Sequence, residues 1–212
     1  MSRSWAPSFF KDSYKGTGEV AIQSYLLTNR NIFLQGEITE ETANQFLLQM
    51  LYLQSQNQDP IQIFINSCGG SVNAGMAIYD LIQSVNKEVN LYCVGMAASM
   101  AAIILAGGQQ GHRFILPHSQ TMIHEPMISR GVGGSASSIK NISDSMLETR
   151  ELLTGILSQH TNHSIEEIAE QIAYDHYMNA EETVAFGICD RILTTPFEKI
   201  YGGKDYENDQ GK

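Results

Sequence analysis

Two segments in the first half of the chain carry apolar residues at the spacing of a helix with one buried face. In residues 42–53 these positions are Ala43, Phe46, Leu47, Met50 and Leu51. In residues 71–85 they are Ala74, Ile78, Leu81, Ile82 and Val85. Between the two segments, the apolar run IQIFI predicts a strand that is buried on both faces. The NSCGGS segment that follows predicts a Gly-rich turn, so the order is helix, strand, turn and helix.

The same order of strand and helix is repeated directly afterwards. NLYCVG, at residues 90–95, predicts a second strand, and a helix of small residues opens near Ser99. Three further short strands are predicted at RFILP, TMIHE and CDRIL. Strands that alternate with helices along a chain predict an α/β fold with right-handed crossovers.

A long helix is predicted over residues 138–159, after the Gly/Ser loop SRGVGGSAS. Its apolar stripe consists of Ile139, Ile142, Met146, Leu153, Ile156 and Leu157. At the rise of an α-helix it would extend about 33 Å, so part of it is expected to pack on a neighbouring subunit. Two shorter helices follow, with start signals at Ser164/Glu167 and Asn179/Glu182 and a stop signal at Gly187.

The ends of the chain differ in composition from its middle. Residues 1–20 are polar and are predicted to be an irregular, mobile arm, and residues 197–212 form a polar tail. A single domain is expected over residues 21–196. The first residues lack the apolar stretch of a signal peptide. Residues 89–111 are uncharged but contain several Gly, Asn and Gln residues, so no membrane span is expected there.

The net charge and the spacing of the cysteines argue against several classes of function. The chain has 212 residues and a formal net charge of −10, and it shows no basic cluster, so nucleic-acid binding is not expected. Charged residues make up 17%, which is low and favours extra buried surface in an oligomer. Three widely spaced cysteines without a CxxC motif indicate neither a disulfide framework nor a zinc site, and they fit a cytoplasmic protein.

Candidate chemistry gathers where three predicted strands end. NSCGG, GMAAS and HEP each follow a strand, and the carboxyl ends of strands are where α/β folds hold reacting groups. Ser99 would be a nucleophile at a helix start, with His124 as its base and Asp175 orienting the imidazole. Each residue also has a structural reading on its own: Ser99 as packing, His124 as a core histidine and Asp175 as a helix cap. There is no G-x-S-x-G motif.

Four longer motifs link these residues to a known family. They are INSCGGSVNAGMAIYD, GMAASMAAIILAGG, RFILPHSQTMIHEP and DHYMNAEETVAFGICDRI. From about residue 25 to residue 195 the sequence resembles the proteolytic subunit of the Clp protease, a serine peptidase. The resemblance implies a crotonase-like α/β fold of repeated βαβ units. It also implies a catalytic triad at Ser99, His124 and Asp175, with oxyanion donors at the backbone N–H groups of Gly70 and Met100.

The resemblance further implies an assembly. Two stacked heptameric rings, a tetradecamer, would enclose a degradation chamber, with the long helix as the handle that joins them and residues 1–20 as an axial loop. A ring-shaped AAA+ Clp ATPase would unfold polypeptide substrates and feed them in. This chain has no P-loop, so it is expected to bind no cofactor and not to hydrolyse ATP itself, and the partner unfoldase would use the ATP. No metal site is expected either, because His160 and His163 lack a carboxylate or Cys ligand pattern around them.

Three departures from the family pattern stand out. Cys68 replaces the usual Pro of NSPGG, and Glu125 replaces the Gln of HQP. Ala173 and Tyr174 replace an acidic-basic pair that joins the two rings in many members. These changes suggest a divergent paralogue that works in a mixed assembly with a second ClpP-type subunit.

The main hypothesis is therefore an ATP-dependent serine endopeptidase subunit. Two alternatives stay open from the sequence. The chain could be a catalytically silent structural subunit of a mixed Clp assembly. It could also be a crotonase-fold acyl-CoA hydratase or isomerase, which uses paired backbone N–H groups but normally acts through carboxylates.

Overall fold

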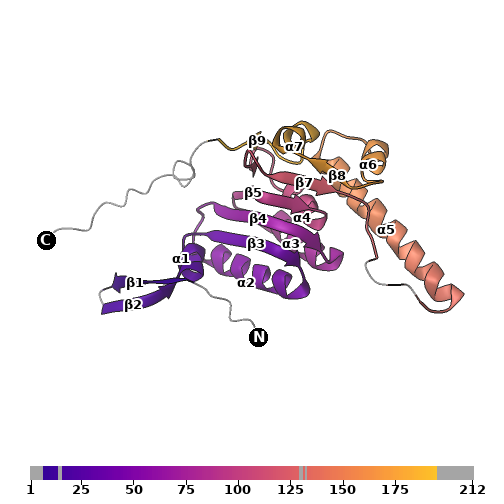
Figure 1. Ribbon diagram of the computed structural model, residues 1–212. Helices are drawn as coiled ribbons and strands as arrows, with labels where there is room; N and C mark the ends of the chain where they lie inside the picture. Colours follow the sequence, from indigo (N-terminus) through magenta and orange to yellow (C-terminus); the bar gives the residue numbers. More distant parts are fainter. Residues whose placement is uncertain (1–6, 14–15, 129–130, 132, 195–212) are drawn as a thin grey trace.

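The computed structural model describes residues 7–13, 16–128, 131 and 133–194. Its centre is a mostly parallel seven-stranded sheet (Figure 1). The strands are β3 (Asn31–Ile38), β4 (Ile61–Gly70), β5 (Val89–Ala98), β6 (Arg113–Ile115), β7 (Gln120–Ile123), β8 (His176–Met178) and β9 (Arg191–Ile192). The order is β3-β4-β5-β6-β9, with β7 paired to β5 and to β8. Within this sheet every strand pair is parallel except β7–β8, which confirms the predicted α/β class.

Three crossover helices follow the first strands and close the main apolar core. They are α2 (Glu40–Gln56), α3 (Val72–Ser84) and α4 (Met100–Ala106). The first two begin at side-chain caps, because Thr39 accepts a hydrogen bond from the Thr42 N–H and Ser71 from the Ala74 N–H. Helix α4 is wholly buried, as its run of small and aliphatic residues requires.

The predicted apolar face of α2 is only partly correct. Ala43, Phe46 and Met50 are buried, but Leu51 is 52% exposed and Leu53 is buried in its place. Counted from Ala43, the helix therefore buries Phe46 at i+3 and Met50 at i+7, and it leaves Leu51 on its outer side. The predicted face of α3 is buried except for the half-buried Leu81.

Strand β5 is longer than predicted, because it continues beyond residue 95 to Ala98. Gly95 lies in the left-handed region at φ 91°, and on either side of it the strand has different neighbours. Residues 91–93 pair with β6, whereas residues 96–98 pair with β7. The break at Gly95 lets one strand serve two partners, and it places the end of β5 beside the end of β7.

Helix α5 (Ala136–His160) confirms the predicted long helix and extends away from the sheet (Figure 1). Its second half is buried at Leu153, Ile156 and Leu157. Its first half leaves Ile139 and Leu147 exposed. The packing of this half on a neighbouring subunit stays a prediction.

Two short helices after α5 confirm the predicted start and stop signals. Helix α6 (Ile165–Gln171) and helix α7 (Ala180–Phe186) both begin with complete capping boxes. Gly187 ends α7 in the left-handed conformation at φ 91°.

The N-terminal region differs from its prediction. The residues between 8 and 21 that the structure describes form an antiparallel hairpin, β1 (Ser8–Ser13) with β2 (Gly16–Ala21), and α1 (Ile22–Thr28) follows. The prediction of irregular structure was wrong there, because Phe9 packs edge-on against Tyr25 and ties the hairpin to α1. The tail at 197–212 lies outside the described residues, and the division into arm, domain and tail stays a prediction. None of the helices that the structure describes is long and apolar enough to cross a membrane.

Candidate active site

A cleft of about 510 Å³ opens where β4, β5 and β7 end. Four of the five residues singled out in the sequence line it, namely Gly70, Ser99, Met100 and His124. The fifth, Asp175, lies behind His124 and is not part of the lining. The parallel strands thus bring together residues that are far apart in the sequence, as expected for strand carboxyl ends.

Ser99 occupies a strained backbone conformation between β5 and α4. Its φ of 54° and ψ of −124° are rare for a residue with a side chain. The conformation is held by a hydrogen bond of 2.8 Å from the Ser99 N–H to the Met122 carbonyl, and the Ser99 carbonyl accepts the Ala102 N–H at 2.9 Å. Such strain typically costs about 1–3 kcal/mol and is common at functional residues. The sharp turn presents the Ser99 side chain to the cleft.

The glycine pair at the end of β4 is required by close contacts. Gly69 and Gly70 have φ angles of 88° and 154°. A Cβ on Gly69 would lie 2.8 Å from the Ser99 Cβ, and a Cβ on Gly70 would overlap the Ile38 carbonyl. Without side chains, this segment packs directly against the Ser99 turn and leaves its backbone open to the cleft.

His124 connects Ser99 to Asp175. Its Nε2 lies 2.9 Å from the Ser99 Oγ, within hydrogen-bond distance. Its Nδ1 lies 3.3 Å from the Asp175 Oδ1, but the two groups lack the alignment of a hydrogen bond. The antiparallel β7–β8 pair explains the proximity, since Ile123 is paired with His176 and the next residues along, His124 and Asp175, follow at the same end. The His124 side chain is 13% exposed and that of Asp175 is 55% exposed.

This arrangement supports nucleophilic catalysis. The imidazole can accept the Ser99 hydroxyl proton, and a carboxylate beside the other ring nitrogen can hold the ring and stabilise its cation. Met100 begins α4, so its backbone N–H has no partner within that helix and can serve a developing oxyanion. The hydroxyl, the base and the candidate oxyanion donors therefore meet in one cleft.

Further residues of the cleft were not singled out by pattern. Its walls include the apolar side chains of Ile103, Met122, Leu153, Leu157 and Ile172. These positions read as ordinary core residues, and no signal in the sequence separates them from the rest of the core. Glu37 adds a carboxylate at the cleft. Cys68, which the sequence had marked as a departure from the family pattern, also lines the cleft and is exposed. The lining offers mainly apolar surface to a bound substrate.

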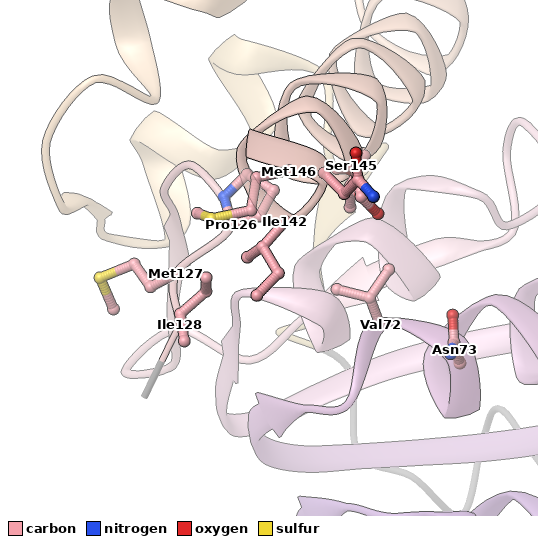
Figure 2. Close-up of a pocket in the computed structure, with 10 residues that line it drawn as sticks. Val72, Asn73, Pro126, Met127, Ile128, Ile142, Ser145 and Met146 are labelled. Atoms are coloured by element: carbon pink, nitrogen blue, oxygen red, sulfur yellow. The ribbon is translucent and has the colours of Figure 1, made fainter. Parts of the chain in front are cut away.

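A second pocket of about 400 Å³ adjoins the cleft (Figure 2). Val72, Pro126 and Met127 line both spaces. Figure 2 shows the second pocket between the segment after His124, the start of α3 and helix α5, which contributes Ile142 and Met146. The two pockets therefore share part of their lining along the segment that follows His124.

Two of the three cysteines lie in the core. Burial raises the pKa of the Cys93 thiol to about 12 and also raises that of Cys189, so both are protonated thiols at neutral pH. All three cysteines are free. Within the described ranges, no three or more His, Cys, Asp or Glu residues are grouped in a way that could hold a metal ion.

The chain was also compared with protein families. The model of the Clp protease family matches residues 15–196, well over half of the sequence. The mostly parallel sheet with its crossover helices is in keeping with the crotonase-like fold of that family. This chain belongs to the Clp protease family and is a ClpP-type peptidase.

Proposed function

We propose that this chain is a serine endopeptidase subunit that cleaves unfolded polypeptides. The observation that carries the proposal is the 2.9 Å contact between the Ser99 Oγ and the His124 Nε2 in an apolar cleft. The strained backbone of Ser99 supports it, since a serine that only fills space has no need of a positive φ.

The proposed reaction proceeds through an acyl-enzyme. The Ser99 Oγ attacks the peptide carbonyl carbon while His124 takes the hydroxyl proton. The backbone N–H groups of Gly70 and Met100 hold the oxyanion. His124 then gives the proton to the leaving amine as the C–N bond breaks. A water molecule then attacks the acyl carbon while His124 takes its proton. The bond to the Ser99 Oγ breaks, His124 returns the proton to Ser99, and the carboxylic acid product is released. Asp175 orients the His124 ring in both steps.

The proposed function includes an ATP-dependent assembly. Members of the family generally form oligomers that work with Clp ATPases, and we expect two stacked heptameric rings fed by an AAA+ unfoldase. The exposed apolar side chains on the first half of α5 support burial against another subunit, because water-exposed apolar faces of this kind mark interaction sites. ATP would be used by the unfoldase, in the cytoplasm.

A second candidate is a silent structural subunit in a mixed assembly. The observation that favours it is the exposed Asp175, which lies near His124 without forming an aligned hydrogen bond. In a silent subunit this incomplete alignment would persist in the assembly, and a second ClpP-type subunit would supply the catalysis. The third hypothesis from the sequence, acyl-CoA chemistry, has less support, because the family match identifies a peptidase.

The test is intact mass after treatment with a fluorophosphonate, with the Ser99→Ala variant as control. One adduct on the native protein and none on the variant is expected, together with hydrolysis of a short fluorogenic peptide that Ser99→Ala lacks. No adduct on the isolated protein, and adduct formation after a second ClpP-type subunit is added, would favour the mixed assembly. No adduct under either condition would overturn the proposed catalysis and favour the silent structural subunit.

A further inference from the structure

We propose that the ion pair between Glu125 and Arg150 is a positioning device that holds His124 between Ser99 and Asp175. The inference rests on the proposed function, because it concerns the base of that reaction. Glu125 directly follows His124, and Arg150 lies on α5. The Arg150 Nε is 3.2 Å from the Glu125 Oε2, which is an ion-pair distance without the alignment of a hydrogen bond.

Arg150 also reaches the segment that leads to Asp175. Its Nη2 donates a long hydrogen bond of 3.5 Å to the carbonyl of Ala169, which belongs to the last turn of α6. A cation near the carbonyl end of a helix is favourably placed, because the unpaired carbonyls there carry partial negative charge. One arginine therefore contacts both the residue that follows His124 and the helix that precedes Asp175.

Glu125 makes a second link through its backbone. Its N–H donates to the Ile172 carbonyl at 2.9 Å, and Ile172 ends α6 three residues before Asp175. Within the described part of the chain, the Asp175 carboxylate has His124 as its one polar contact. The path of the backbone from α6 to β8 therefore fixes where Asp175 lies, and Glu125 and Arg150 fasten that path to the His124 segment.

The exposure of the pair indicates an effect on geometry more than on stability. The Glu125 and Arg150 side chains are 48% and 36% exposed, and ion pairs at such exposure contribute little to the free energy of unfolding. Catalysis is more sensitive, because a small displacement of a reacting group lowers the rate strongly. We therefore expect loss of the pair to reduce turnover while the fold is retained.

The experiment measures peptide hydrolysis by Glu125→Ala, Arg150→Met and the charge-swapped double variant Glu125→Arg/Arg150→Glu. Each single change should lower kcat about tenfold while KM stays within about twofold, and the swap should recover only part of the loss, because a carboxylate at position 150 restores the ion pair but cannot donate to the Ala169 carbonyl. Lys140→Met is the matched control, because it removes the exposed Lys140–Asp144 ion pair on the same helix. It should leave kcat unchanged, and the melting temperatures of all variants should be close to that of the native protein.

The outcomes separate this inference from the proposed function. Full kcat in both single variants would overturn the positioning role while an inactive Ser99→Ala leaves the proposed function intact. A loss of kcat that comes with a lower melting temperature and no recovery in the swap would also overturn it, because this indicates a purely structural role. Hydrolysis by Ser99→Ala would overturn both.

Discussion

Two of the ion pairs in the structure, Arg113–Asp190 and His124–Asp175, have very different surroundings. Arg113 and Asp190 approach to 2.7 Å, with side chains that are 7% and 17% exposed. His124 and Asp175 approach to 3.3 Å, and the Asp175 side chain is more than half exposed. Arg113 begins β6 and His124 follows β7, and both of these strands pair with β5.

The buried pair is saturated with hydrogen bonds. Asp190 accepts from the Arg113 guanidinium and from the backbone N–H groups of Gly111 and Arg113. Arg113 also donates to the carbonyls of Ala106 and His160, at 2.9 and 3.0 Å. The site pair has a single close contact without hydrogen-bond alignment. The Arg113–Asp190 pair therefore stabilises the fold, because both side chains are held by several hydrogen bonds. The His124–Asp175 pair has fewer partners, so its groups are available for catalysis.

The largest expected effect is on the free energy of unfolding when the buried Arg113–Asp190 ion pair is broken. Asp190→Ala leaves the Arg113 guanidinium buried without its counter-charge, so we expect the free energy of unfolding to fall by about 3 kcal/mol. Urea denaturation would measure this fall. Asp144→Ala is the matched control, because it removes an exposed ion pair and should change stability little. A fall no larger than that of the control would remove the distinction between the two pairs.

The stability that the Arg113–Asp190 ion pair contributes is also expected to depend on pH. Burial would raise the pKa of Asp190, but the hydrogen bonds from Arg113 and Gly111 outweigh it and lower that pKa below 3.8. A lowered folded pKa means that the unfolded chain binds the proton first as the pH falls. The stabilisation is therefore complete above about pH 4 and is lost at lower pH. The stability difference between the native protein and Asp190→Ala should shrink there, and a constant difference would contradict this.

The second effect concerns the open pair. Asp175→Asn replaces the proposed orienting carboxylate with a neutral amide, and we expect kcat for peptide hydrolysis to fall about 100-fold. Because Asp175 is exposed, the free energy of unfolding should change by no more than about 0.5 kcal/mol. Asp144→Asn serves as the control for a surface change. Full activity in Asp175→Asn would show that another group orients His124.

Periodicity predicted most of the fold, because one-sided burial leaves a clear mark. The helices α2, α3 and α5 and the capping boxes of α6 and α7 all follow from local patterns. The errors occurred where tertiary contacts decide. Leu51 has an apolar side chain on the outward side of α2. The hairpin before α1 has a weak strand pattern and depends on a contact between Phe9 and Tyr25.

The candidate site was predictable to different degrees. Ser99 and His124 follow apolar strands, so the rule for strand ends identifies them. Asp175 follows no apolar strand; its place between two predicted helices made it a weaker candidate to hold the imidazole, and the family resemblance strengthened that assignment. No sequence pattern indicates a functional role for Arg150, because an arginine on a long helix is typical of a solvent-exposed face. Its contact with Glu125 arises from the packing of α5 against α6 and the segment after β7, which no local pattern encodes.

The smallest expected effect is the relief of backbone strain at Ser99, a strain that the Arg113–Asp190 pair does not have. Ser99→Gly accepts the positive φ without strain, whereas Ser99→Ala retains the strain. Relief of about 1–3 kcal/mol exceeds the entropic cost of glycine, about 0.5–1 kcal/mol, so Ser99→Gly should be more stable by about 1 kcal/mol. Ser145 on α5 is the control, because there the glycine variant should be the less stable one. Chemical denaturation of the four variants gives both differences, and the same sign at the two positions would contradict strain at Ser99.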